Sequence, residues 1–337
     1  MKTEELAKLF SQVLPDQCLV SNEAALRTFE CDGLSAFREL PGLVVLPDNI
    51  GHVMAALKVC RENAIPVVGR GAGTGLSGGA LPHPEGIVLS LSRMNKLLEV
   101  DTENRIARVE PGMTNLKISK EVEHLGLYYA PDPSSQIACS IGGNIAENSG
   151  GVHCLKYGLT VHNVIAVKVA TIEGDLIDMG HQSLDSPGFN LLSLMVGSEG
   201  MMGIVVEATV KLLPIPECAR VVMAIFDSVQ KAGDSVASVI ASGIIPAGIE
   251  MMDNPAIRAA EAFVNAGYPV DAKAILLCEL DGTDEEVDHQ IQQVTQLFQD
   301  SGANEVRVAK DEYERQLFWA TVALAPGRDE RQKPARR

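Results

Sequence analysis

Residues 70–80 read Arg-Gly-Ala-Gly-Thr-Gly-Leu-Ser-Gly-Gly-Ala, and this composition points to chemistry more clearly than any other stretch. The loop directly follows residues 65–68, an apolar segment that predicts a strand. A glycine-rich backbone can turn tightly and bring its N–H groups against an anion without side chains in the way. The sequence therefore predicts a pyrophosphate loop, with Arg70 and the loop N–H groups as donors. The alternative is a bare turn with a purely structural role.

The pattern G-x-G-x-x-G, which begins at Gly73, also occurs in Rossmann folds, but its context here differs. A Rossmann loop opens a helix and is followed about 20 residues later by a carboxylate for the ribose. This loop instead runs into Pro82 and Pro84 and then into the apolar run 86–91, which ends without a carboxylate. Proline and glycine disfavour a helix interior, and no Gly-Lys-Ser/Thr follows as a Walker motif would require. The loop is therefore predicted to join strand to strand.

Two further segments are rich in small residues and adjoin predicted strands. Residues 139–151 read Cys-Ser-Ile-Gly-Gly-Asn-Ile-Ala-Glu-Asn-Ser-Gly-Gly, and residues 197–204 read Gly-Ser-Glu-Gly-Met-Met-Gly-Ile. Asn144 and Asn148 are four residues apart, so on one helical turn their amides would share a face. Each segment alone could be a compact turn. Three such segments, far apart in sequence, are more simply explained by convergence on one large planar ligand.

Composition excludes several classes of function. The formal net charge is −16 and the sequence has no stripe of Lys and Arg, which argues against nucleic-acid binding. The negative charge does not exclude a pyrophosphate site, because solvent ions screen distant carboxylates over roughly 8 Å. No apolar run approaches the ~20 residues of a membrane span, and the N-terminus has no signal-peptide core. The seven cysteines are scattered without a C-x-x-C pair, which indicates reduced thiols and a cytoplasmic protein.

The pattern of elements predicts an α+β chain with four parts. Residues 43–47 read as a strand, Asp48 as the cap of a helix, and residues 97–109 and 164–179 as two hairpins. The predicted parts are an N-terminal helical segment, a domain that carries the three glycine-rich segments, a ferredoxin-like cap domain and a basic, disordered tail. Their boundaries are residues 1–37, 38–216, 217–320 and 321–337.

The predicted cap domain has the β-α-β-β-α-β order of a ferredoxin-like fold once its middle helix is set aside. Its expected strands are residues 220–226, 247–252, 274–280 and 306–309. Its expected helices are residues 229–241, 255–266 and 285–299.

Taken in order, the three glycine-rich segments resemble the FAD-binding domain of the vanillyl-alcohol-oxidase superfamily, also called PCMH-type. Within it the chain is similar to the flavin subunits of glycolate oxidases, over nearly everything from residue 29 to residue 320. The most specific pieces are residues 70–80, 128–160 and 197–204.

The resemblance implies FAD as the cofactor, an FAD-binding domain of two α/β subdomains and an incomplete ferredoxin-like cap domain. It also assigns parts of FAD to parts of the chain. Residues 70–78 would wrap the pyrophosphate. Pro131, Asp132 and residues 140–150 would line the flavin and ribityl chain, and Glu199, Gly203 and Ile204 would hold the adenosine end. The implied cofactor-binding residues are Arg70, Gly71, Ala72, Gly73, Thr74, Gly75, Leu76, Ser77, Gly78, Pro131, Asp132, Ser135, Ser140, Ile141, Gly142, Gly143, Asn144, Ala146, Asn148, Gly150, Glu199, Gly203 and Ile204. His153 either faces the isoalloxazine or is an ordinary packed or exposed histidine.

The reaction implied by the family is oxidation of a small 2-hydroxy acid, glycolate or D-lactate, to the 2-oxo acid. Hydride passes from Cα to flavin N5 while a histidine base takes the hydroxyl proton. Electrons leave through the other glycolate oxidase subunits, one of them iron–sulfur, and the chain could reach the inner face of the membrane through them. D-Lactate dehydrogenase, D-2-hydroxyglutarate dehydrogenase and a non-catalytic FAD-binding module remain open as alternatives.

The chain departs from the family pattern after residue 320. The family continues with a substrate-binding arginine, a His-x-x-x-x-x-x-His metal pair and a Glu-His dipeptide, whereas this chain ends in a basic, Pro-rich stretch typical of disorder. We therefore expect a shortened, impaired enzyme with no metal, although a genuine short form stays open. Glu250 either lines the substrate cavity or is a strand-end carboxylate. The seven histidines, none in a metal-ligand pair by sequence, are 52, 83, 124, 153, 162, 181 and 289.

Overall fold

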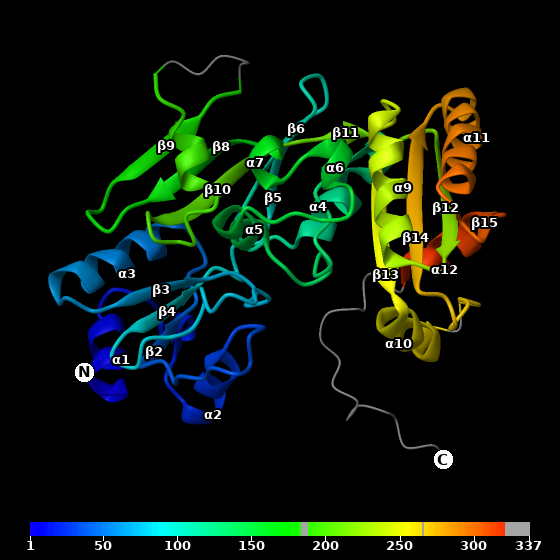
Figure 1. The fold of residues 1–337 in the computed structure, drawn as a ribbon. Helices are drawn as coiled ribbons and strands as arrows, with labels where there is room; N and C mark the ends of the chain where they lie inside the picture. The colour runs from blue at the N-terminus through cyan, green and yellow to red at the C-terminus, as the bar shows by residue number, and fades with distance from the viewer. Residues whose placement is uncertain (183–187, 265, 321–337) are drawn as a thin grey trace. The chain divides into compact units, whose positions relative to one another are not determined.

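The computed structural model describes residues 1–182, 188–264 and 266–320 (Figure 1). The chain divides into two compact units, which are described separately. Unit 1 comprises residues 1–150 and 158–214, and unit 2 comprises residues 151–157 and the chain from residue 215 onward. The predicted disordered tail, residues 321–337, lies outside the described residues.

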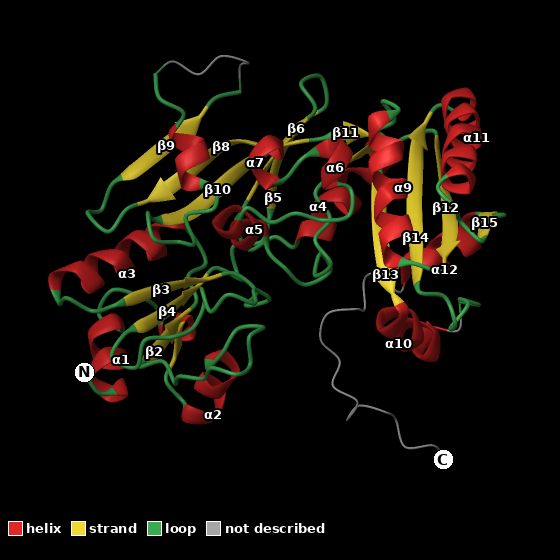
Figure 2. Cartoon of the chain, in the orientation of Figure 1, coloured by secondary structure: helices red, strands yellow, loops and turns green. Residues whose placement is uncertain are grey.

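Unit 1 begins with a four-stranded sheet in the order β1-β2-β4-β3 (Figure 2). Strands β2 and β3 are both parallel to β4, and β1 is antiparallel to β2. The glycine loop therefore joins two parallel neighbours, β3 and β4, as predicted, with no helix between them. The elements of this part are α1 (Thr3–Phe10), η1 (Asp16–Cys18), β1 (Leu19–Val20), α2 (Glu23–Leu26), η2 (Arg27–Phe29), β2 (Leu43–Val45), α3 (Ile50–Glu62), β3 (Val67–Arg70) and β4 (Ile87–Ser90).

Helices α1 and α3 bury their apolar faces in the same core as β2 and β4. Leu6 and Phe10 of α1 and Val53 and Leu57 of α3 are almost fully buried in it, following the i, i+3, i+4 spacing of an amphipathic helix. Asp48 is not the cap of α3, so that prediction was wrong. Asn49 is the cap, because its Oδ1 accepts the His52 N–H at 3.0 Å.

The second sheet of unit 1 is antiparallel and has the order β5-β6-β10-β8-β9. Both predicted hairpins are confirmed, since β5 pairs with β6 and β8 pairs with β9. Strand β10 lies between the two hairpins. The elements are β5 (Leu97–Asp101), β6 (Ile106–Val109), α4 (Asn115–Val122), η3 (Glu123–Leu125), β7 (Leu127–Tyr128), α5 (Ile141–Glu147), α7 (Thr160–Asn163), β8 (Val164–Ala170), β9 (Leu176–Gly180), α8 (Leu191–Met195), β10 (Ile204–Lys211) and β11 (Leu213–Pro214).

Unit 2 is built on a four-stranded antiparallel sheet in the order β13-β14-β12-β15. If the strands are numbered within the unit, this order is 2-3-1-4, the strand order of a ferredoxin-like β-α-β-β-α-β fold. Helix α10 is an insertion between the second and third strands. The elements are α6 (Cys154–Tyr157), β12 (Cys218–Phe226), α9 (Val229–Ala241), β13 (Gly248–Asp253), α10 (Asn254–Val264), β14 (Ala274–Gly282), α11 (Asp284–Asp300), β15 (Glu305–Val308) and α12 (Glu312–Ala320).

The two faces of this sheet bury different cores. Alternate residues of β12 and β14 face α9 and α11 on one side, and the others face α10 and α12 on the opposite side. Strand β14 is consequently apolar on both faces until Glu279 and Asp281, two residues apart, interrupt it.

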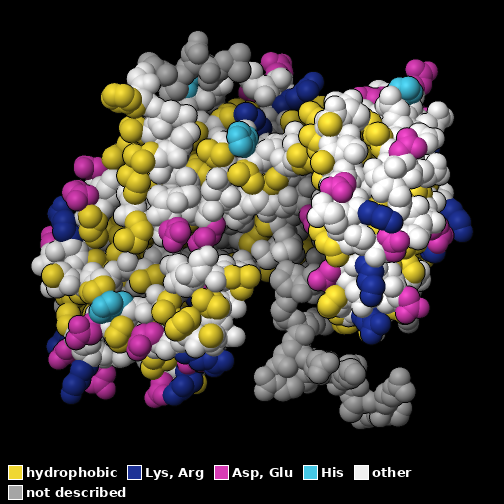
Figure 3. Space-filling model, in the orientation of Figure 1, with side chains coloured by type: hydrophobic (Ala, Val, Ile, Leu, Met, Phe, Trp, Pro, Cys, Tyr) yellow, Lys and Arg dark blue, Asp and Glu magenta, His cyan; other side chains and the backbone are white. Residues whose placement is uncertain are grey.

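Charged side chains are mixed on the surface. On the face drawn in Figure 3, the Lys and Arg side chains of both units are interspersed with Asp and Glu. Among the described residues, no helix combines the length and apolar character that crossing a bilayer requires.

Candidate cofactor site

The three glycine-rich segments meet at one cavity in unit 1, which has a volume of about 290 Å³. This lies near the lower end of the range for small-molecule pockets, so the cavity encloses part of a dinucleotide rather than the whole molecule. The predicted residues that line it are Arg70, Gly71, Ala72, Gly73, Thr74, Gly75, Leu76, Ser135, Ser140, Gly142, Gly143, Asn144, Ala146, Glu199, Gly203 and Ile204.

The glycine loop brings unused backbone donors to this cavity. No described residue accepts a hydrogen bond from the backbone N–H groups of residues 71–80. Several of its carbonyls are used, since Gly75 O accepts from Gly33 N–H at 2.9 Å and Gly78 O from Leu81 N–H at 3.0 Å. Because free N–H groups beside a cavity favour an anion, this arrangement fits the pyrophosphate of FAD.

Arg70 supports the loop from inside. Its side chain is only 9% exposed, its Nη1 donates to the carbonyls of Cys31 at 2.8 Å and Ala80 at 3.5 Å, and its guanidinium lies 5.5 Å from the centre of the Phe29 ring. Burial lowers the pKa of Arg70, yet an arginine remains a cation at neutral pH. A cation that ties the two ends of a loop to a neighbouring segment fixes the shape of that loop.

Helix α5 contributes bare backbone rather than free donors. Its cap, Ser140, accepts the Gly143 N–H through Oγ at 3.3 Å. The N–H groups of Ile141 and Gly142 donate to the carbonyls of Met113 and Pro111 at 2.9 and 2.8 Å. The first-turn donors are therefore already used, and the glycines of α5 instead present a flat surface to the cavity.

Asn144 and Asn148 do not share a face, so this prediction was wrong. Asn144 is buried, and its side chain bonds with that of Asn115 at 3.1 Å. Helix α5 ends at Glu147, and Asn148 has a left-handed backbone with φ of 51°. That turn directs its Oδ1 to the Val161 N–H, at 3.0 Å, and Asn148 does not line the cavity.

The third segment adds carboxylates to the cavity wall. Glu199 is held in a left-handed conformation, φ 52°, with its N–H bonded to the Ala146 carbonyl at 2.8 Å. Asp32 and Glu147 also line the cavity. Burial and the negative charges of Glu199 and Asp32 raise the pKa of Glu147. Carboxylates here suit ribose hydroxyls better than phosphate oxygens.

Seven implied cofactor residues lie outside the cavity lining. Ile141, for example, is fully buried in the core beneath α5, and the Pro131 carbonyl accepts from Asn115 Nδ2 at 3.0 Å. The full set is Ser77, Gly78, Pro131, Asp132, Ile141, Asn148 and Gly150.

Sequence reasoning missed twelve residues that do line the cavity. Six of them stand within the three segments and could have been included with them: Gly79, Ala80, Cys139, Glu147, Ser149 and Gly200. The others are brought there by the fold, and the complete set is Asp32, Gly69, Gly79, Ala80, Leu91, Pro111, Cys139, Glu147, Ser149, Met195, Gly200 and Val205.

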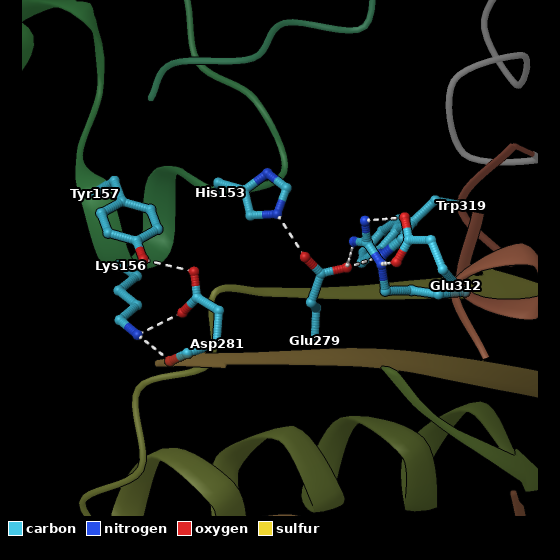
Figure 4. A network of polar contacts seen from close by, with 8 residues as sticks. His153, Lys156, Tyr157, Glu279, Asp281, Glu312 and Trp319 are labelled. Carbon is cyan, nitrogen blue, oxygen red and sulfur yellow. Dashed lines mark hydrogen bonds and ion pairs between the residues drawn. The ribbon is translucent and has the colours of Figure 1, made fainter. Parts of the chain in front are cut away.

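Unit 2 holds a buried polar network centred on Glu279 (Figure 4). Its side chain is 4% exposed. Its Oε1 lies 3.2 Å from His153 Nε2. Its Oε2 accepts hydrogen bonds from Arg315 Nη1, at 3.0 Å, and from Trp319 Nε1. Arg315 is also paired with Glu312, and the two carboxylates raise its pKa. A buried carboxylate requires such compensation.

Asp281, two residues along the same strand, has a second set of partners. Its backbone carbonyl accepts from Lys156 Nζ at 2.8 Å, and its carboxylate accepts from Tyr157 Oη at 2.5 Å (Figure 4). Residues 151–157 are thus attached to β14 through both carboxylates. His153 belongs to this network, and Glu250 lies in β13 opposite Leu277.

Two family models match the chain. One, described as FAD binding domain, matches residues 41–180, and the other, FAD linked oxidases, C-terminal domain, matches residues 215–333. The FAD prediction is thereby confirmed.

Two curated relatives that are 56% and 38% identical to this chain are named as glycolate oxidase subunits. The chain is 56% identical over 307 residues to glycolate oxidase subunit GlcD of Escherichia coli K12, a match that covers 91% of this chain and 62% of that one. It is 38% identical to GlcD of Bacillus subtilis, covering 93% and 67%. A D-lactate dehydrogenase of Anaerostipes hadrus is 32% identical, covering 94% and 68%. The chain therefore spans about 62% of the length of its Escherichia coli relative.

Solved structures of low identity share the fold. Alkyldihydroxyacetonephosphate synthase superposes with a TM-score of 0.78 at 19% identity, covering 94% of this chain and 64% of that one. p-Cresol methylhydroxylase superposes with a TM-score of 0.78 at 20% identity, covering 93% and 68%. These matches confirm the predicted α+β architecture of the PCMH type, and together with the sequence matches they show that the chain belongs to the FAD-linked oxidase family.

Proposed function

We propose that this chain binds FAD in the cavity of unit 1 and is the flavin subunit of an oxidase that converts glycolate, or D-lactate, to the 2-oxo acid. The observation that carries the proposal is the glycine loop, whose backbone N–H groups find no acceptor among the described residues and line a cavity shared with two other small-residue segments. The glycolate oxidase names of the more similar relatives support the substrate.

Each segment of the cavity has a definite task in this proposal. The N–H groups of the loop residues that line the cavity, 71–76, 79 and 80, bind the pyrophosphate oxygens, and Arg70 keeps the loop in shape through the Cys31 and Ala80 carbonyls. Gly143 gives a planar ring close access to backbone, because it carries no Cβ, and Gly142 lets α5 pack closely on Pro111. Glu199 accepts from ribose hydroxyls.

FAD, when bound, supplies the acceptor for the hydride that leaves the substrate Cα. The chain must then hold the 2-hydroxy acid beside it and take up the hydroxyl proton. We assign no catalytic base or carboxylate-binding arginine among the described residues. The flavin subunit would pass its electrons to partner subunits, one of them an iron–sulfur protein, and we place it in the cytoplasm, at the membrane only through those partners.

The direct test is to purify the full chain and record its flavin spectrum before and after anaerobic addition of glycolate. Bound FAD that is bleached by glycolate supports the whole proposal, whereas colourless protein that also fails to bind added FAD rejects it. Gly73→Val is a matched probe, because Gly73 has φ of +72° and a Cβ there would collide with the Arg70 guanidinium. Gly233→Ala, on an open face of α9, is its control.

D-Lactate dehydrogenase is the second candidate, because a D-lactate dehydrogenase is among the relatives. Bleaching by D-lactate but not by glycolate would favour it, and bleaching by D-2-hydroxyglutarate alone would indicate the dehydrogenase for that acid. FAD that none of the three acids reduces would leave a flavin-binding module without turnover.

A further inference from the structure

Three potential metal ligands of different chemistry lie together in unit 1, away from the cofactor cavity. They are the Cys18 thiol at the end of η1, the Asp48 carboxylate after β2, and the His52 imidazole in the first turn of α3. Their ligand atoms all lie within 4.8 Å of one another. Cys18 Sγ is 3.4 Å from Asp48 Oδ2 and 3.8 Å from His52 Nδ1. None of the three lines the cavity.

Ordinary local structure does not account for this grouping. Asp48 would usually serve as the helix cap, but Asn49 has that role. The contacts that hold the group together are weak, since a thiol is a poor donor and the Asp48 N–H reaches His52 Nδ1 only at 3.4 Å, beyond the usual range of a hydrogen bond. Little bonding would be lost if a metal ion replaced these contacts.

The two distances from the Cys18 sulfur match those of a tetrahedral zinc site. With Zn–S of about 2.3 Å and Zn–N or Zn–O of about 2.0 Å, the sulfur of such a site lies about 3.5 Å from each nitrogen or oxygen ligand. The observed separations of 3.4 and 3.8 Å lie on either side of this value. One sulfur, one nitrogen and one oxygen form a donor set that zinc accepts, and hard cations such as Mg²⁺ do not take thiolate.

Arg93 lies beside the group, and its charge acts on both Asp48 and Cys18. Its Nη1 lies 3.5 Å from Asp48 Oδ1, while Oδ2 is the oxygen that faces Cys18. A partner on the outer oxygen fixes the orientation of a ligating carboxylate. Cys18 is fully buried, whereas Asp48 and His52 are partly exposed, so an ion can enter from the side of α3.

We propose that Cys18, Asp48 and His52 bind one zinc ion through Sγ, Oδ2 and Nδ1, with water in the fourth position. The thiol gives up its proton to solvent on binding, as any cysteine ligand must. The ion joins η1 to the first turn of α3, and so clamps the N-terminal segment to the first sheet. This site is separate from the proposed function and does not depend on FAD.

The test is zinc retention by the full, reduced, tag-free chain after dialysis, followed by replacement with cobalt. The proposal predicts one zinc per chain and, for cobalt, the intense visible bands of a tetrahedral site with a thiolate charge-transfer band. His52→Gln and Cys18→Ser should each lower metal affinity at least tenfold. Cys60→Ser is the matched control, because Cys60 is buried in the same core but has no imidazole or carboxylate beside it, and it should retain the metal.

The result decides the matter even if Cys18→Ser does not fold. His52 is partly exposed, so His52→Gln should fold and settle the question alone. Less than half an equivalent of bound metal in the wild-type chain would overturn the proposal. So would unchanged affinity in His52→Gln, or octahedral cobalt spectra without charge transfer.

Discussion

The packing of the glycine loop against α5 can be tested by adding one methyl group. A Cβ built on Gly71 would lie well inside contact distance of Ser140 Oγ and 3.4 Å from the Gly143 N and Cα atoms. Gly71→Ala can therefore be accommodated most easily if Ser140 rotates its hydroxyl away. That rotation breaks the bond from Gly143 N–H to Ser140 Oγ, which caps α5.

The size of the effect follows from that one bond. Loss of a serine cap costs about 1 kcal/mol, roughly a fivefold change in the folding equilibrium. The backbone at Gly71 is outside the left-handed region, so alanine also gains about 0.4–1 kcal/mol by restricting the unfolded chain. The two terms have opposite signs, and the single variant does not separate them. In a Ser140→Ala background the clash and the cap are both absent, and only the gain remains.

The informative quantity is therefore the coupling between Gly71→Ala and Ser140→Ala, which we expect to be about 1 kcal/mol. Urea unfolding of the four proteins, followed by far-ultraviolet circular dichroism, measures it. Trp319, the only tryptophan, lies in unit 2, so its fluorescence transition should not change. Effects that add to within ~0.3 kcal/mol would show that the loop does not contact α5 through Ser140.

Three further outcomes follow from a buried ion pair, from buried thiols and from the carboxylates of the cavity. Glu279→Gln should lower the free energy of unfolding of unit 2 by about 3 kcal/mol, because it breaks a buried ion pair; an unmoved Trp319 fluorescence transition in urea would contradict this. Burial raises the pKa of the Cys60 and Cys278 thiols to about 12. The unfolded chain loses the thiol protons above the ordinary pKa of 9.0, whereas the folded chain keeps them up to about pH 12. The free energy of unfolding should therefore fall between pH 9 and 12, by about 1.4 kcal/mol per pH unit for each thiol. In urea unfolding, Cys278→Ala should make this fall less steep. Glu147→Gln should strengthen FAD binding by roughly twofold to tenfold in fluorescence titration, because it removes one of the carboxylates that line the cavity, whereas Glu4→Gln, outside the cavity, should not.

The sequence predicted those features of the fold that local rules determine. Alternating apolar residues on both sides of a short polar turn predicted the two hairpins. Pro82 and Pro84 indicated that the glycine loop runs from strand to strand without a helix. The ferredoxin-like order of unit 2 followed from the succession of helices and strands. In each case neighbouring residues carry the information.

Features decided by distant partners could not be predicted in the same way. Asp48 and Asn49 are equally good caps by type, but the Asp48 side chain faces Cys18 and Arg93, which approach from elsewhere in the chain. The same holds for α5. Its own sequence does not indicate that its first N–H groups are used by the carbonyls of Pro111 and Met113, which approach from elsewhere in the chain.

The charge of the cavity shows why composition is a poor guide to a binding site. Screening can remove the effect of distant carboxylates on a pyrophosphate, but Asp32, Glu147 and Glu199 line the cavity itself. Burial, and after it the charges of Glu199 and Asp32, raise the pKa of Glu147, so these carboxylates oppose one another there. An anion can still bind, because backbone N–H groups act at hydrogen-bond distance, where their attraction is strongest. The phosphates of FAD would then bind at the loop, and its hydroxyl groups at Glu199. The carboxylates would also weaken FAD binding, so that removal of one negative charge should raise the affinity measurably.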